Sequence, residues 1–220
     1  MTIGLKNMKR NRKYIVIIGE GLTEFYYFNS LRQSYRQLQI RPVYPHHSSS
    51  MEELELEIDK AVDDGCPYIV CVVDMDNKKD EKEKWAYERL KKRKEGKHWI
   101  RRKGLEYEIR FIETEPCTEL FFLFYFIYTT HHFGHQPELL HELNKHCLYE
   151  KKESFFRKHP LHQYFEKSGG DFMQALRNAA QSMKEKEETD RDYTYSQMAE
   201  LFEALGIHSF KDNHDNRDNI

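Results

Sequence analysis

The stretch Tyr14-Ile15-Val16-Ile17-Ile18, followed directly by Gly19-Glu20-Gly21, decides the fold. A continuous run of apolar and mostly β-branched residues is typical of a strand that is buried on both faces, as in a parallel sheet. The glycines then end the strand in a turn. We therefore expect residues 14–18 to form a central parallel strand.

The segments that follow repeat this pattern. Thr23 is a candidate cap for a helix that includes Phe25 to Leu31, and 40–44 is a candidate second strand. A Ser-rich cap begins a helix over about 48–63, and a fully apolar strand follows at 68–73. Strands that alternate with helices predict right-handed crossovers and a parallel sheet.

The rest of the chain predicts a fourth strand at 107–112 and a mostly helical C-terminal half. An aromatic helix is expected from about Cys117, and further helices over 137–146, 155–165, 170–186 and 195–205. The fold class is therefore α/β, with a parallel sheet of about four strands, flanking helices and a helical C-terminal extension. The expected organisation is a core over 1–135 with an insertion at 78–104 (a polar helix, then a loop at 96–104), a helical region over 136–208 and a polar tail over 209–220.

The composition predicts a globular, cytoplasmic protein. Charged residues make up 33% of the chain and hydrophobic residues 39%, with 14 Tyr and 14 Phe to fill a core. The longest apolar run, 120–128, has about half of the roughly 20 residues that a membrane-spanning helix needs, and no signal-peptide pattern follows the basic start. The four cysteines show no C-x-x-C spacing, so neither disulfides nor structural zinc are expected.

Four acidic residues follow two of the predicted strands. Glu20 and Glu24 come after the first strand, and Asp74 and Asp76 come directly after the third. In a parallel sheet, ligands bind beyond the carboxyl ends of the strands, and carboxylates this close repel each other unless a cation neutralises them. Oxygen ligands favour Mg²⁺ or Mn²⁺ over zinc, so we predict a divalent-metal site, with Glu24 as a candidate ligand for a second ion. The alternative is a set of solvated acids at helix N-termini, where acids are common.

A basic segment follows the second acidic pair. Residues 78–103 contain 13 Lys and Arg against 5 Asp and Glu, a net charge of +8 in a chain whose net charge is −2. Such a segment attracts a polyanion, and aromatic rings stack on unpaired bases, so RNA or DNA is the predicted partner. The alternative is a charged helix that is simply solvated. The candidate binding residues are Lys91, Lys92, Arg93, Trp99, Arg101, Arg102 and Lys103, with Trp85 and Tyr87 as further stacking candidates.

The acidic motifs and one later segment resemble a known family. Residues 17–24 (Ile-Ile-Gly-Glu-Gly-Leu-Thr-Glu) and 72–76 (Val-Val-Asp-Met-Asp) are similar to the Glu and Asp-x-Asp motifs of the Toprim domain, the metal-binding, Rossmann-like fold of topoisomerases, bacterial primases and OLD-family nucleases. Residues 116–123 (Pro-Cys-Thr-Glu-Leu-Phe-Phe-Leu) resemble the Pro-Cys-Phe-Glu-Leu-Trp segment of RloB-like proteins, a Toprim branch found among bacterial restriction and abortive-infection genes. The resemblance covers roughly residues 14–205.

This resemblance implies a Mg²⁺-dependent nuclease that hydrolyses phosphodiesters in defence against phage. Glu20 would act in acid–base chemistry or bind metal, and Asp74 and Asp76 would hold the ion, so these three are the candidate catalytic residues. Glu24 would match a second metal-binding acid, and Glu119 would be a supporting acid near the site. An alternative role for Glu119 is that of a helix-terminal acid stabilised by the helix dipole.

The chain departs from the family pattern at three positions. Glu115, Thr118 and Phe121 stand where Asn, Phe and Trp are usual, which is compatible with a divergent branch of altered substrate choice.

Two other functions compete with a nuclease. One is a non-catalytic Toprim module that binds nucleic acid or a partner ATPase or restriction-system protein, because the chain has no P-loop motif of its own. The other is a haloacid-dehalogenase-like phosphatase, because residues 72–77 also resemble that family's nucleophile strand. Lys78-Lys79 stands where the phosphatases have Thr or Val, which argues against this alternative.

Overall fold

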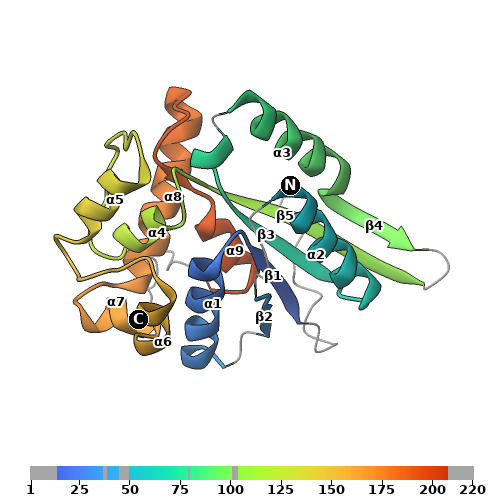
Figure 1. The fold of residues 1–220 in the computed structure, drawn as a ribbon, viewed down its shortest axis with the longest axis horizontal. Coiled ribbons are helices and arrows are strands. Elements are labelled where there is room, and N and C mark those ends of the chain that lie inside the picture. Colours follow the sequence, from blue (N-terminus) through green and yellow to red (C-terminus); the bar gives the residue numbers. More distant parts are fainter. Residues whose placement is uncertain (1–13, 37–38, 45–49, 79, 101–103, 208–220) are drawn as a thin grey trace, which may run out of the picture.

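The computed structural model describes residues 14–36, 39–44, 50–78, 80–100 and 104–207, and it has the predicted α/β fold with a mostly parallel sheet (Figure 1). The strand order is β2 (Ile40–Pro42), β1 (Ile15–Gly19), β3 (Tyr68–Asp74), β5 (Leu105–Glu115) and β4 (Gly96–Ile100), while β6 (Tyr195–Ser196) pairs with the carboxyl end of β5. Strands β2, β1, β3 and β5 are parallel, whereas β4 and β6 run antiparallel to β5.

Helices cover both faces of this sheet. On one face lie α2 (Met51–Asp63) and α3 (Glu81–Lys94), and on the other lies α1 (Leu22–Ser34) with all later helices. These later helices are α4 (Glu119–Leu123), α5 (Gln136–Leu143), α6 (Glu153–Lys158), α7 (Leu161–Lys167), α8 (Phe172–Thr189) and α9 (Met198–Ala204). The larger apolar core therefore lies between the sheet and the C-terminal helices.

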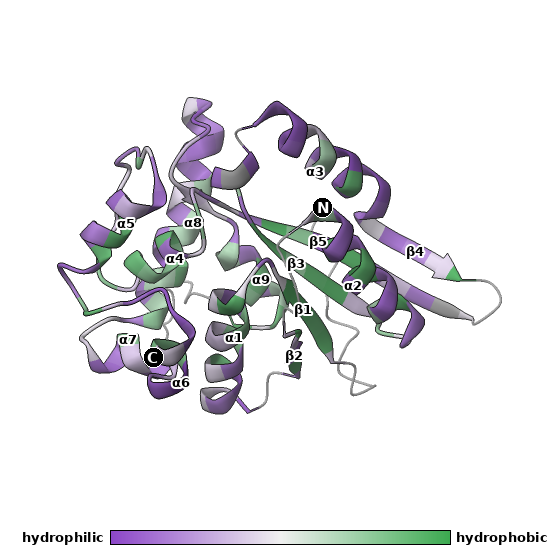
Figure 2. Cartoon of the chain, in the orientation of Figure 1, coloured by the Kyte–Doolittle hydropathy of each residue, from purple (hydrophilic) through white to green (hydrophobic). Residues whose placement is uncertain are grey.

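The apolar residues of β1 pack into two cores, one on each face of the sheet. Ile15 and Ile17 pack into the larger core, and Val16 and Ile18 pack into the smaller one, because successive side chains of a strand point to opposite faces. Figure 2 shows the same contrast, with hydrophobic central strands and a hydrophilic outer surface on α3. The prediction of a central parallel strand is confirmed.

The first two helices begin in different ways. Ser50 caps α2 as predicted, since its hydroxyl accepts the Glu53 backbone N–H at 3.2 Å. The predicted cap at Thr23 is wrong, because α1 begins at Leu22 and the Glu24 carboxylate accepts the Gly21 backbone N–H at 2.8 Å. The start of α1 therefore places an acidic side chain against the end of β1.

Residues 96–100 of the predicted loop over 96–104 instead form the strand β4, and 101–103 lie outside the described residues. Residues 96–100 pair antiparallel with 105–109, and the rings of His98 and Tyr107 stack at a centroid distance of 5.0 Å. A glycine, a lysine and a histidine make this strand hard to recognise in the sequence, because its stability depends on pairing with the long strand β5.

Two predicted helices are interrupted. The helix expected over 155–165 is divided into α6 and α7 at Pro160, which has no N–H to continue a helical hydrogen-bond series. The helix expected over 195–205 begins with the short strand β6, after Thr194 adopts a φ of 53°. The aromatic helix is also shorter than expected, because α4 ends at Leu123. The predicted polar tail over 209–220 lies outside the described residues.

None of the helices in the described ranges combines the length and apolar character that crossing a membrane requires.

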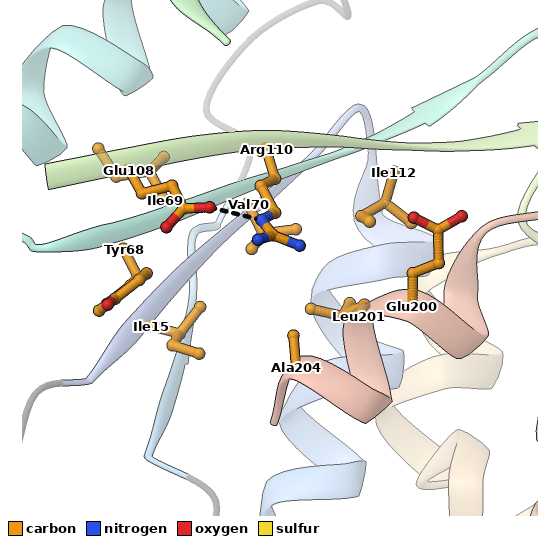
Figure 3. Close-up of a pocket in the computed structure, with 10 residues that line it drawn as sticks. All are labelled: Ile15, Tyr68, Ile69, Val70, Glu108, Arg110, Ile112, Glu200, Leu201 and Ala204. Carbon is orange, nitrogen blue, oxygen red and sulfur yellow. Dashed lines mark hydrogen bonds and ion pairs between the residues drawn. The ribbon is translucent and has the colours of Figure 1, made fainter. Parts of the chain in front are cut away.

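A small pocket lies toward the amino ends of the parallel strands, beside α9 (Figure 3). Ile15, Tyr68 and Leu201 form part of its wall, and Arg110 donates to Glu108 at 2.7 Å within it. This pocket is at the opposite end of the strands from the acidic motifs.

Candidate metal centre

Asp74 is fixed at the carboxyl end of β3 by the residue before helix α4. The Thr118 backbone N–H and hydroxyl both donate to Asp74 Oδ1, at 2.8 and 2.9 Å. Strands β1 and β3 are adjacent and parallel, with Gly19 opposite Val72, so the residues that follow both strands meet at one edge of the sheet. The Asp74 carboxyl is thereby held in a single position at this edge.

Asp74 belongs to a buried cluster with Cys117 and Glu119. Among the described residues, this is the only group of three acidic, cysteine or histidine side chains whose ligand atoms all lie within 4.8 Å of one another. All three residues are buried, and Glu119 is fully inaccessible at 0% exposure. Two carboxylates and a thiol at this spacing could hold a metal ion.

Glu119 is held by contacts from α1 and from the loop between α5 and α6. The Tyr149 hydroxyl donates to its Oε1 at 3.0 Å, and the Thr23 hydroxyl of α1 lies 3.5 Å from the same atom. The ammonium group of Lys151 lies 3.0 Å from Glu119 Oε1. A buried carboxylate requires such partners, because burial without them costs several kcal/mol.

Glu24 lies against this cluster because β1 ends in a residue without a side chain. A Cβ at Gly19 would lie 2.2 Å from the Glu24 Cβ, so only glycine permits this close approach. Burial and then the charge of Glu119 raise the pKa of Glu24. The negative charge of Glu24 in turn raises the pKa of Asp74, where burial is the largest cause.

Glu20 contacts a buried lysine, Lys78. Lys78 Nζ donates to Glu20 Oε1 at 2.8 Å, and the exposed fractions of these two side chains are only 3% and 7%. Burial raises the pKa of Glu20 to about 7, against the lowering effect of Lys78, and the charges of Glu24 and Asp76 contribute to the increase. Glu20 can therefore gain or lose a proton near neutral pH.

The structure thus assembles the predicted acids in two adjoining groups. Glu24, Asp74 and Glu119 form one group, and Glu20 and Asp76 form the other. Burial and neighbouring negative charges raise the pKa values of Glu20, Glu24 and Asp74, because ionised carboxylates are unfavourable in the same buried space.

Sequence reasoning did not identify Cys117, Thr118, Lys78 or Lys151 as site residues. Cys117 and Thr118 could have been found from the segment 116–123, which contains both and resembles a segment of RloB-like proteins. The two lysines gave no signal, because one belongs to a long basic segment and the other is 32 residues from the carboxylate that it contacts.

Several candidates in the basic segment are paired with acids of the same chain. Lys91 Nζ donates to Glu113 at 2.6 Å, and Arg93 forms an ion pair with Glu55 of α2. Tyr87 is buried at 2% exposure, so its ring is inaccessible for stacking on a base.

Other candidates in this segment remain accessible. Lys92 is exposed, and Trp85 and Trp99 are 61% and 60% exposed. The Arg89 guanidinium lies 5.2 Å from the centre of the Trp85 ring. Arg101, Arg102 and Lys103 lie outside the described residues.

The architecture and the acidic edge define a class, the α/β proteins with a candidate metal centre at the carboxyl ends of parallel strands. The chain belongs to the RloB-like protein family, whose model matches residues 15–205. Comparison with curated proteins and with solved structures gave no match.

Proposed function

We propose that this RloB-like chain is a metal-dependent phosphodiesterase that acts on nucleic acid. The observation that carries the proposal is the convergence of buried carboxylates at one sheet edge. The ligand atoms of Asp74, Cys117 and Glu119 lie within 4.8 Å of one another, and the charge of Glu24 acts on Asp74 from beside them. Carboxylates with raised pKa values are relieved by a cation, so the cost of assembling them favours metal binding.

The donor atoms fit Mg²⁺ or Mn²⁺. Asp74, Glu119 and Glu24 supply carboxylate oxygens, the ligands that these ions prefer. Burial and then the charges of Glu119 and Asp74 raise the pKa of the Cys117 thiol, which keeps it protonated and a weak ligand. When bound, such an ion polarises a phosphate and lowers the pKa of an attacking water.

The protein's own residues supply the proton transfer. Glu20 has a pKa of about 7 and lies beside the cluster, so its carboxylate is suited to accept a proton from water at neutral pH. Lys78 orients that carboxylate through the hydrogen bond to Oε1. Asp74 is oriented in the same way by Thr118.

The outer surface of α3 supports nucleic acid as the substrate. Trp85, Arg89 and Lys92 are exposed on this helix, and α3 begins five residues after Asp76, where the acidic edge lies. A tryptophan ring beside a guanidinium offers a stacking surface for an unpaired base, while the cations attract the phosphates. Trp99 on β4 adds a second exposed ring.

The test is cleavage of pooled tRNA, single-stranded RNA and duplex DNA with Mg²⁺ or Mn²⁺. We expect metal-dependent cleavage by the wild type and its loss in Asp74→Asn and Glu20→Gln. Asp59→Asn and Glu57→Gln, on the outer surface of α2, are matched controls that should cleave like the wild type. Equal cleavage by the wild type and Asp74→Asn would contradict the proposal.

The family's association with restriction and abortive-infection genes extends the proposal to phage defence. Cells that carry the wild-type chain, together with any partner ATPase of the same gene cluster, should lower the plating efficiency of phage, and cells that carry Asp74→Asn should not. Equal plating on both would remove the defence role from the proposal.

A specific observation favours a second candidate, the non-catalytic module. Lys78 and Lys151 already place ammonium groups on Glu20 and Glu119, so the chain partly neutralises its acids without any ion. This candidate predicts salt-sensitive nucleic-acid binding that persists in Asp74→Asn, without turnover under any metal.

A further inference from the structure

Lys78 is a buried cation inside the acidic edge, although it belongs to the basic segment. Its side chain is 3% exposed, and its ammonium group lies 2.8 Å from Glu20 Oε1. A lysine is almost never buried without a partner, because the loss of hydration must be compensated by a nearby opposite charge. Lys78 is therefore part of the site and separate from the surface that attracts a polyanion.

The backbone after Asp74 places Lys78 in this position. Residues Asp76–Lys78 form a single turn of 3₁₀ helix, labelled η2, in which the Lys78 backbone N–H donates to the Met75 carbonyl at 3.0 Å. The Asp76 backbone N–H donates to the Pro116 carbonyl at 2.8 Å, which ties the turn to the end of β5. The turn directs the chain back over the carboxyl end of β1, where Glu20 lies.

The acidic edge has two parts, and the Lys78 ammonium group contacts Glu20 in one of them. Glu20, Lys78 and Asp76 form one part, in which the charges of Lys78 and Asp76 both act on the pKa of Glu20. Asp74, Cys117 and Glu119 form the other part, in which Glu24 and Glu119 act on the pKa of Asp74 more strongly than Glu20 does. Among the described residues, only Asp74, Cys117 and Glu119 have ligand atoms that all lie within 4.8 Å of one another.

We propose that Lys78 takes the place of a second divalent cation, so that the site binds a single divalent ion at Asp74 and Glu119. The ammonium group supplies a positive charge and three hydrogen-bond donors where an ion bridging Glu20 and Asp76 would otherwise lie. Glu20 is then held by Lys78 and remains available for proton transfer. The inference rests on the metal site of the proposed function and is independent of its hydrolytic activity.

The test is the number of Mn²⁺ ions bound per chain, measured by equilibrium dialysis with electron paramagnetic resonance at pH 7.5. We expect one ion in the wild type and two in Lys78→Met, because removal of the ammonium group leaves the Glu20 carboxylate to bind a second ion. Lys78→Arg keeps the positive charge and should bind one ion. Lys84→Met, at an exposed position of α3, is the control and should also bind one.

The outcomes separate this inference from the proposed function. Two ions in the wild type would overturn the inference even if Lys78→Met does not fold, and one ion in a folded Lys78→Met would overturn the role of the ammonium group. No binding by the wild type would overturn both the inference and the metal dependence. One ion in the wild type and two in Lys78→Met, without cleavage of any nucleic acid, would support the inference while contradicting the hydrolytic function.

Discussion

The acidic edge of the sheet and the outer surface of α3 both contain many charges, but in opposite environments. At the edge, the side chains of Lys78 and Glu20 are 3% and 7% exposed, whereas those of Arg93 and Glu55 on the surface are 51% and 30% exposed. A buried charge loses several kcal/mol of hydration and depends on its partner, whereas a surface ion pair contributes about 0–1 kcal/mol. A cation bound at the edge would therefore lower the free energy of the folded protein by neutralising the buried carboxylates. A cation near the surface ion pairs would change it little.

The largest expected effect comes from removing the cation that pairs with a fully buried carboxylate. Lys151→Met should lower the free energy of unfolding by about 3 kcal/mol or more, because it leaves the fully buried Glu119 carboxylate without its ion pair. Arg93→Met, which breaks the surface pair with Glu55, should lower it by at most about 1 kcal/mol. Urea unfolding of both variants measures the difference, and equal losses would remove the distinction between the two regions.

A second effect is the pH dependence of stability. The pKa of Glu20 is raised to about 7 in the fold, so the unfolded chain loses this proton at lower pH than the folded chain. Without metal, stability should therefore fall as pH rises from about 4.5 to about 7, by on the order of 3 kcal/mol at most from this residue. Urea unfolding of the metal-free protein at pH 5 and pH 7.5 measures this decrease.

Two comparisons support that assignment. Glu20→Gln should show a shallower decrease, because the amide does not titrate. Addition of Mn²⁺ at pH 7.5 should restore stability, because an ion that binds only the folded chain shifts the equilibrium toward it. A decrease in Glu20→Gln as large as that of the wild type would assign the effect to other groups.

A smaller effect should follow from adding one methyl group. Gly19→Ala places a Cβ 2.2 Å from the Glu24 Cβ, so Glu24 must move away from the cluster. Overpacking of this kind costs about 1–3 kcal/mol, and Mn²⁺ affinity should fall by about tenfold or more. Ala86→Gly on α3 is the control, because it changes a small residue away from the site. Gly65→Ala does not serve as a control, because Gly65 has a φ of 79° and an alanine there would be strained for a separate reason.

The smallest effect is expected on the surface of α3. Trp85→Ala should weaken binding of single-stranded RNA by about 1 kcal/mol or somewhat more, roughly tenfold, because one stacking surface is lost. Trp85→Phe should retain much of the affinity, and binding of duplex DNA should change little. Fluorescence anisotropy at fixed salt measures all three, and an unchanged affinity of Trp85→Ala for single strands would exclude this ring as a contact.

The central strands could be predicted from the sequence because each is specified by a run of consecutive apolar residues. The apolar runs of β1 and β3 specify buried parallel strands, and parallel strands place Glu20 and Asp74 at one edge. The strand β4 could not be predicted, since its five residues are stabilised by pairing with β5 and not by an apolar pattern of their own.

The ion pairs of the site could not be predicted, because they join distant parts of the chain. Lys78 and Glu20 are 58 residues apart, and lysines within a basic segment are usually solvated. The cysteine spacing gave no sign of a metal site, because Cys117 lies beside Asp74 only through the approach of the segment before α4 to the end of β3.

Thr118 has a consequence for the denticity of Asp74. Its backbone N–H and hydroxyl both donate to Oδ1, so an ion bound as proposed would be left with Oδ2, and Asp74 would hold it through one oxygen. Ca²⁺ takes six to eight oxygen ligands and often uses both oxygens of one carboxylate, whereas Mg²⁺ is satisfied by one or two carboxylates and several waters. At the proposed metal centre, these two hydrogen bonds from Thr118 would therefore favour Mg²⁺ over Ca²⁺.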